Sequence, residues 1–242
     1  MSSYMPGTQV ISRAARLGLV LAIAMLVAGA MAACDSTSSP GAAARSEPAG
    51  QVIANVRRAV AGARSVHLTG QEKRGTTLVT LDVSFSGDEV AGSVGENGTT
   101  YDVLALGSNV YVKVDPSILQ LGQLPASLCA HFCGHYVELP ASTVEKVTGN
   151  VSMSSVTAQA FSGALASAAK KPGAKFEPAT VAGTSVLEYR SNGYTLAVAS
   201  TGPAYPVLYT GPDGSHMTFS DWNSVRLPGP PPASQVVSLS QL

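Results

Sequence analysis

Residues 76–86 read TTLVTLDVSFS, and this stretch sets the expected fold. Its apolar side chains alternate with polar ones, which is the period of an extended strand. The apolar set is Val79, Leu81, Val83 and Phe85, and the polar set is Thr80, Asp82 and Ser84. One apolar and one polar face are typical of an antiparallel sheet with a solvated side. The stretch therefore predicts a sheet that buries only one of its faces.

Turn signals on both sides extend this strand into a meander. Asn97-Gly98 is a strong hairpin signal, and glycine-containing turns separate the other segments. The strands predicted around residues 76–86 are 65–72, 89–95, 99–106 and 109–114. A second group is predicted at 175–182, 185–190, 194–199, 206–210 and 215–221, with single strands at 135–139 and 236–237. Two groups of five consecutive strands indicate one large antiparallel sheet.

A segment with helical spacing of its apolar residues precedes each group of strands in the sequence. Residues 48–63 place apolar side chains on one face, with Ser46 as the expected N-cap and Pro48 in the first turn. Residues 152–169 form a second expected helix whose apolar face is mostly alanine, and 116–122 a short third one. The order of elements predicts an α+β fold of about ten strands with helices on one face of the sheet.

The N-terminus has the layout of an export signal. Arg13 and Arg16 precede a 17-residue uncharged apolar run from Leu17, which ends in Met31-Ala32-Ala33-Cys34. The alternative is a transmembrane helix, because the run nearly reaches the about 18 residues that a span needs. Six alanines and two glycines make the run weakly apolar, and no positive cluster follows it. We therefore expect cleavage before Cys34.

The end of this signal resembles the lipobox of bacterial lipoprotein precursors. In that motif the cysteine receives a diacylglyceryl group and becomes the first residue of the mature protein, although Met31 stands where leucine is usual. The expected organisation is a signal peptide at 1–33, a flexible Ser/Ala/Gly/Pro tether at 34–49 and one domain at 50–242. Acyl chains on Cys34 would hold the protein at the outer face of the cell membrane.

Composition and charge exclude several classes of function. Only 12% of the residues are charged, and loss of Arg13 and Arg16 with the signal leaves thirteen basic against fifteen acidic residues. A slightly acidic domain is a poor partner for nucleic acid and for an anionic surface. The sequence lacks the Gly-x-Ser-x-Gly, Walker, dinucleotide-binding and His-Glu-x-x-His motifs. We therefore expect a protein that is not an enzyme and holds no cofactor.

Two cysteines and two histidines lie close together near the middle of the chain. Cys129, His131, Cys133 and His135 have donor types that suit zinc or copper. So tight a spacing seldom lets four ligands converge, and an exported protein meets oxidising conditions. A disulfide between Cys129 and Cys133 is the favoured reading, and a metal site is the alternative. We interpret His67 and His216 as solvated or packed histidines.

Two short sequence segments resemble a known protein family. SVHL at 65–68 follows the first helix, and FSDWN at 219–223 precedes a proline-rich tail. Together with the lipobox and tether, they resemble actinobacterial lipoproteins of the LppX and LprG type, which share the LolA-like fold. The resemblance spans about residues 50–242. It implies a curved half-barrel sheet around helices, with a hydrophobic cavity for acyl chains or glycolipids.

The resemblance leads to two expectations of function. The first is an envelope-anchored carrier that binds an acylated lipid or glycolipid in its cavity. The second is a sensory or protein-interaction module that engages envelope proteins through the same fold. The residues expected to line the cavity are Val79, Leu81, Val83 and Phe85 of the sheet and Ala160, Phe161, Ala164 and Leu165 of the second helix. Small alanines leave room for a ligand, but they also permit close packing of helix on sheet.

Overall fold

A computed structural model describes residues 45–238, apart from 97, 122, 141–152 and 154–170. The chain forms two compact units, Met1–Ala42 and Ala43–Leu242, and only the second contains described residues. Several predictions lie outside the described residues. They are the signal peptide, the lipidated Cys34, and the second helix at 152–169 (Met153 excepted) with its lining residues Ala160, Phe161, Ala164 and Leu165.

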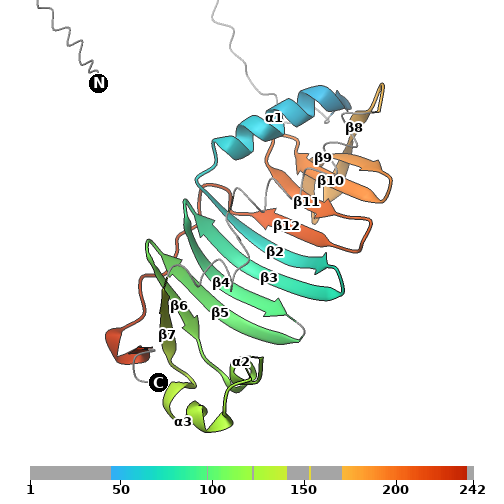
Figure 1. Ribbon diagram of the computed structural model, residues 1–242. Coiled ribbons are helices and arrows are strands. Elements are labelled where there is room, and N and C mark those ends of the chain that lie inside the picture. The colour runs from blue at the N-terminus through green and yellow to red at the C-terminus, as the bar shows by residue number, and fades with distance from the viewer. Residues whose placement is uncertain (1–44, 97, 122, 141–152, 154–170, 239–242) are drawn as a thin grey trace, which may run out of the picture. The chain divides into compact units, whose positions relative to one another are not determined.

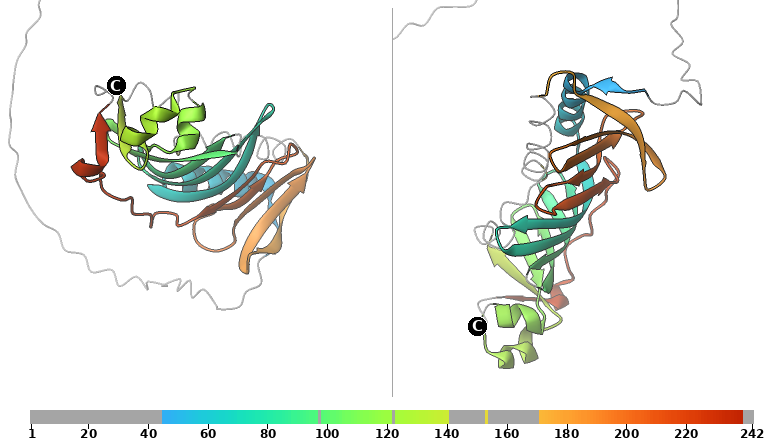
Figure 2. Two further views of the ribbon diagram at one scale, coloured as in Figure 1. Left: turned by 90° about the horizontal axis from the view of Figure 1, so that it is seen from below. Right: turned by 90° about the vertical axis from the view of Figure 1, so that its right-hand side faces the viewer.

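The described unit is built on one open, curved sheet of thirteen strands (Figures 1 and 2). The strands are β1 (Glu47–Pro48), β2 (Ser65–Arg74), β3 (Thr77–Ser86), β4 (Glu89–Glu96), β5 (Thr99–Leu106), β6 (Asn109–Lys113), β7 (Tyr136–Pro140), β8 (Lys175–Val181), β9 (Thr184–Ser191), β10 (Tyr194–Ala199), β11 (Pro206–Thr210), β12 (His216–Ser220) and β13 (Val236–Ser238). The helices are α1 (Ala49–Ala61), α2 (Pro116–Leu121) and α3 (Cys129–Phe132). The α+β class with a large curved antiparallel sheet is confirmed, and among the described strands only β1 was not among the predicted ranges.

The sheet consists of two meanders joined side by side. Its order is β1-β8-β9-β10-β11-β12-β2-β3-β4-β5-β6-β7-β13. The joint is the antiparallel pairing of β12 with β2, in which Phe219 stands opposite Leu68 and Ser220 opposite His67. Only β13 is parallel to its neighbour, β7. Residues more than 150 positions apart in the sequence thus become neighbours at the centre of the sheet.

The beginning of the unit differs from the sequence prediction. Glu47 and Pro48, which were assigned to the tether, pair with Phe176 and Lys175 of β8. Pro48 is the N-cap of α1 and no side chain caps this helix, so the expected cap at Ser46 was wrong. The physical reason is that β1 keeps this segment extended up to Pro48. The helix therefore begins only at Ala49.

Register places nearly all large apolar side chains on one face, which we call the inner face. Val83 of β3 stands opposite Leu68 of β2, and Phe85 stands opposite Val90 of β4. Because side chains alternate along a strand, a register that aligns these pairs aligns their whole apolar sets. The inner face and the buried side of α1 together form the main apolar cluster.

Two glycines bring neighbouring strands unusually close on the inner face. Gly70 and Gly92 have φ values of 153° and 147°. A Cβ at Gly92 would collide with the carbonyl oxygen of Asp82, and one at Gly70 with that of His216. Any side chain there would push the strands apart. Glycines at such points let a sheet bend, which fits the curvature seen in Figure 2.

The segment between β12 and β13 crosses the opposite, outer face. Near its start, Trp222 still packs against the main apolar cluster; its ring stacks on Tyr205 at 4.7 Å and its Nε1 donates a hydrogen bond to the carbonyl of Pro206. Farther on, Leu227 and Val236 pack against a small outer cluster. The buried members of that cluster are Ala91, Leu104 and Tyr111. The proline-rich tail is therefore a strap that fixes β13 beside β7.

Candidate functional site

The inner face is the largest apolar surface that the described strands form. Four of the predicted lining residues belong to it and are buried: Val79, Leu81, Val83 and Phe85 are 6%, 4%, 2% and 2% exposed. The face continues on both sides of β3. Leu68, Val94, Val103, Val110, Leu196 and Phe219 are among its other buried members. The alternation in residues 76–86 thus predicted the orientation of this strand correctly.

Helix α1 covers only one part of the inner face. Its buried side consists of Ala49, Val52, Ile53 and Val56, and Ala49 donates a hydrogen bond to the carbonyl of Ala174 beside β8. Thirteen helical residues span about 20 Å. Thirteen strands at about 4.8 Å spacing make a sheet about 58 Å wide. Even laid straight across the strands, α1 would cover about a third of them.

Other described residues add little to this cover. Ile118 of α2 and Met153 are partly buried and pack against the main apolar cluster. Leu119 of α2 belongs instead to a separate cluster at the β7 end, with Val114 and Val137. Most of the width of the inner face is therefore not accounted for by α1, α2 and Met153.

One polar atom on the inner face is buried without a partner. Tyr189 of β9 is 3% exposed, and its hydroxyl has no hydrogen-bond partner among the described residues. Its ring lies 5.5 Å from that of Phe176, which is fully buried. A buried hydroxyl normally finds a partner, because leaving it without one costs free energy. This donor was not predicted, since the alternation in β9 marks Tyr189 only as an inward-facing residue.

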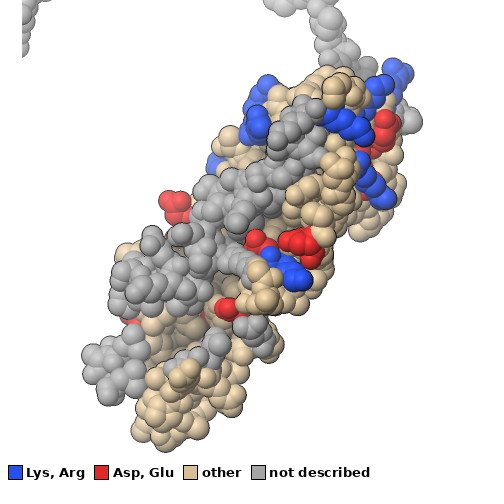
Figure 3. Space-filling view, turned by 45° about the vertical axis from the view of Figure 1, so that its right-hand side comes forward, with Lys and Arg blue, Asp and Glu red and all other residues tan. Residues whose placement is uncertain are grey.

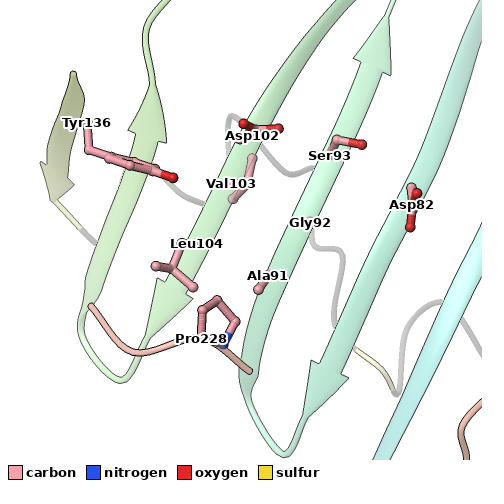
Figure 4. Close-up of a pocket in the computed structure, with 9 residues that line it drawn as sticks. All are labelled: Asp82, Ala91, Gly92, Ser93, Asp102, Val103, Leu104, Tyr136 and Pro228. Carbon is pink, nitrogen blue, oxygen red and sulfur yellow. The ribbon is translucent and has the colours of Figure 1, made fainter. Parts of the chain in front are cut away.

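The outer face carries a pocket of about 330 Å³ beside the strap (Figure 4). Asp82, Ser93 and Asp102 stand in register on β3, β4 and β5 and form its polar side. Leu104 and Pro228 line the apolar side, as Figure 4 shows. The pocket lies on the face opposite to the predicted lining residues. It is therefore separate from the expected cavity.

A hydrogen-bonded network lies on the same outer face. His67 Nε2 is 2.8 Å from Asp82 Oδ1, and its Nδ1 is 3.3 Å from Ser220 Oγ. These residue types resemble a nucleophile, a base and an orienting carboxylate. However, the Ser220 hydroxyl donates to Asp221 Oδ2 at 2.9 Å, so its proton does not point to the imidazole. The geometry leaves Ser220 without a base.

No local sequence pattern indicates this network. His67 and Ser220 are 153 residues apart and meet only because β2 pairs with both β3 and β12. The interpretation of His67 as a solvated or packed histidine named neither of its two partners. A prediction of the β12–β2 pairing would have been needed to find them.

The cysteine loop lies at the β7 end of the sheet. Cys129 and Cys133 have their sulfur atoms at bonding distance and Cα atoms 4.6 Å apart. Between them Phe132 is buried in a small cluster with Val114 and Val137. Among the described residues no group of three or more His, Cys, Asp or Glu side chains is arranged to hold a metal ion. The geometry is compatible with the favoured disulfide, which stays a prediction.

Comparisons with known proteins add a likeness of fold. No known protein family matches the sequence, and no curated protein matches it. The structure is similar to LprF from Mycobacterium bovis, with a TM-score of 0.46, 16% identity, and coverage of 75% of this chain and 96% of that one. It is also similar to the Mycobacterium tuberculosis lipoprotein LppX, with a TM-score of 0.39, 16% identity, and coverage of 74% and 98%.

LppX is also one of the lipoproteins that the sequence resembles. At 16% identity and TM-scores below 0.5, neither structure carries an argument about the ligand of this chain. None of the described helices is long and apolar enough to cross a membrane. The inner face itself is therefore the candidate ligand-binding surface.

Proposed function

We propose that this protein is an envelope-anchored lipoprotein that binds the acyl chains of a lipid or glycolipid against the inner face of its sheet, without covalent chemistry. The observation that carries the proposal is the mismatch in size between the inner face and α1. An apolar sheet face must be covered, and α1 at about 20 Å covers about a third of a sheet about 58 Å wide, so the expected helix at 152–169 and bound acyl chains would share the rest. Acyl chains match the remaining surface in chemistry.

The energetics of such binding are sufficient. If a ligand buried about 400 Å² of apolar surface, the gross gain would be about 10 kcal/mol at about 25 cal/mol per Å². The costs of association reduce this gain, and micromolar affinity remains within reach. The Tyr189 hydroxyl offers a donor for an ester or carboxylate oxygen, and it lies on the same face as the predicted lining residues.

The anchor in this proposal is Cys34, acylated after removal of residues 1–33. It is supported by the basic, apolar and small-residue order of the signal and by the cysteine at its end. Two acyl chains on one cysteine give stable attachment to a membrane. The alternative function, a protein-interaction module without bound lipid, has the same anchor and differs only in what covers the inner face.

Lipid extraction from the purified protein tests the proposal. Noncovalent acyl chains are extracted with organic solvent and counted by mass spectrometry per mole of protein. Ala164→Trp should fill the space beside the inner face and lower lipid occupancy while the protein stays folded. The matched control is Ala179→Trp, which adds the same ring on the outer side of β8 and should leave occupancy unchanged.

A tightly packed interior would behave differently. There Ala164→Trp should overpack and destabilise the protein by about 1–3 kcal/mol or more. Near-zero lipid in wild type and both variants, together with a large loss of stability in Ala164→Trp, would refute the carrier and favour the interaction module. Thermal unfolding of the three proteins supplies the stability measurement.

A further inference from the structure

Charged residues are divided unequally along the sheet. The segments 45–64 and 171–190, which hold α1, β1, β8 and most of β9, contain seven basic and three acidic residues. Residues 65–140, which hold β2 to β7, contain three basic and eight acidic ones. Figure 3 shows this division: Lys and Arg gather over the end with α1 and β8, and Asp and Glu are more frequent farther along.

We call the first group the basic end. Its exposed cations are Arg45, Arg57, Arg58, Arg64, Lys171, Lys175 and Arg190. Of its carboxylates, Glu188 is bound by Arg190 in a bidentate ion pair. α1 contains no acidic residue. Arg58 donates only to the side-chain oxygen of Asn55 at 3.3 Å.

Three other cations of the basic end have no carboxylate partner among the described residues. No ion pair is found for Arg57, Arg64 or Lys175 within the described part of the chain. Lys171, Lys175 and Arg190 also line a surface pocket of about 340 Å³, which Glu177 and Glu188 line as well. The basic end is therefore a surface of largely uncompensated positive charge on a protein whose formal net charge is zero.

The chain enters the unit at this same end. β1 pairs with β8, and Glu47 comes thirteen residues after Cys34. A flexible segment of that length has a root-mean-square reach of about 20 Å, and fully extended it spans at most about 45 Å. An anchor on Cys34 would thus keep the basic end close to the membrane. The acidic strands β3 to β5 follow farther along the sheet.

We propose that the basic end rests on anionic phospholipid head groups of the membrane that holds Cys34. Lysine and arginine side chains bind phosphate oxygens, and clusters of them are attracted to anionic membrane surfaces within a Debye length. Contact at this end orients the domain relative to the bilayer. The proposal depends on the anchor proposed above but not on a lipid bound at the inner face.

Amine labelling of the acylated protein in vesicles tests this orientation. The vesicles contain either phosphatidylcholine alone or phosphatidylcholine with phosphatidylglycerol, and the reagent is a membrane-impermeant succinimidyl ester read out by peptide mass spectrometry. Lys175 belongs to the basic end, whereas Lys73 and Lys113 lie on β2 and β6 and serve as internal controls. All three side chains are exposed.

We expect labelling of Lys175 to slow by about threefold or more in the anionic vesicles at low salt. High salt should restore its rate, because screening shortens the reach of the surface potential. Lys73 and Lys113 should react equally in both vesicles. Equal labelling of Lys175 in both vesicles, or equal slowing of all three lysines, would overturn the proposal and favour another partner for the basic end, such as an acidic protein.

A pair of variants separates the basic end from general charge effects. Arg57→Gln with Arg58→Gln removes two exposed cations of α1 and keeps good helix formers there, so the fold should persist. The matched control is Lys113→Gln, which removes charge from β6. The double variant should weaken the protection of Lys175 and the control should not. Equal protection in both would contradict the proposal.

Flotation of the vesicles distinguishes the two proposals, the lipid anchor on Cys34 and the membrane contact of the basic end. A protein without its anchor would fail to float with neutral vesicles. If it still floated with anionic vesicles at low salt, the basic end would be confirmed without the anchor. If the exported wild-type protein floated with neither kind of vesicle, both proposals would be wrong. If it floated with both and Lys175 reacted equally, the anchor would stand and the basic end would be wrong.

Discussion

Tyr189→Phe should stabilise the lipid-free protein. Among the described residues the buried hydroxyl of Tyr189 has no partner, and the ring, 5.5 Å from that of Phe176, would be kept by phenylalanine. An unsatisfied buried polar group costs about 1–3 kcal/mol. We therefore expect a gain of about 1 kcal/mol, which corresponds to a rise in Tm of about 2–4 °C for a domain of this size. Thermal and urea unfolding of delipidated protein measure it.

The matched control, Tyr111→Phe, should change the free energy of unfolding in the opposite direction. The hydroxyl of Tyr111 accepts a hydrogen bond from Asn109 Nδ2 at 3.3 Å on the outer face, so Tyr111→Phe should cost about 0.5–1 kcal/mol. If lipid-free Tyr189→Phe lost more than about 1 kcal/mol of unfolding free energy, the Tyr189 hydroxyl would have a strong partner, and its assignment as an unsatisfied buried donor would be wrong.

The same variant also reports on the ligand. If a lipid oxygen accepts from the Tyr189 hydroxyl, the stabilising effect should disappear in the lipid-loaded protein. An equal gain in loaded and lipid-free protein would show that the hydroxyl does not contact the lipid. Comparing the two forms therefore locates the polar end of the ligand relative to β9.

Three further predictions concern the anchor, the cysteine loop and a helix cap. Cys34→Ala should abolish acylation and leave the protein free in the medium or as uncleaved precursor; normal processing with detergent partitioning would contradict the lipoprotein reading. Cys129 and Cys133 should gain mass by alkylation only after reduction, whereas free thiols with stoichiometric zinc or copper would support the metal alternative. Asp115 accepts hydrogen bonds from the hydroxyl of Ser117 and the backbone N–H groups of Ser117 and Ile118, which lower its pKa. Asp115→Ala should therefore cost about 1 kcal/mol near neutral pH. This difference should vanish as the pH falls through the lowered pKa and the wild-type carboxyl is protonated, and urea unfolding at both pH values checks it.

Local patterns in the sequence predicted most elements of the sheet. Strict alternation placed β3 correctly with its buried face, and turn residues located the hairpins around it. These signals lie within a few residues of the structure they determine. Helix α1 was also predicted within two residues, because its apolar spacing is regular.

Features that depend on distant pairing were missed. β1 is two residues long and forms only because β8 lies beside it, so its own sequence carries no period. The contacts of His67 with Asp82 and Ser220 likewise require that β2 be flanked by β3 and β12. The basic end could not be seen from net charge, since zero charge over the whole chain hides a separation of charge along the sheet.

Native mass spectrometry of the acylated protein is the most direct test of lipid binding at the inner face. The covalent lipid on Cys34 adds a fixed mass that collisional activation does not remove. We expect an additional mass of an acylated lipid that is lost on gentle activation and is reduced in Ala164→Trp. A spectrum that shows only the covalently acylated chain, for protein purified without delipidation, would contradict lipid binding at the inner face.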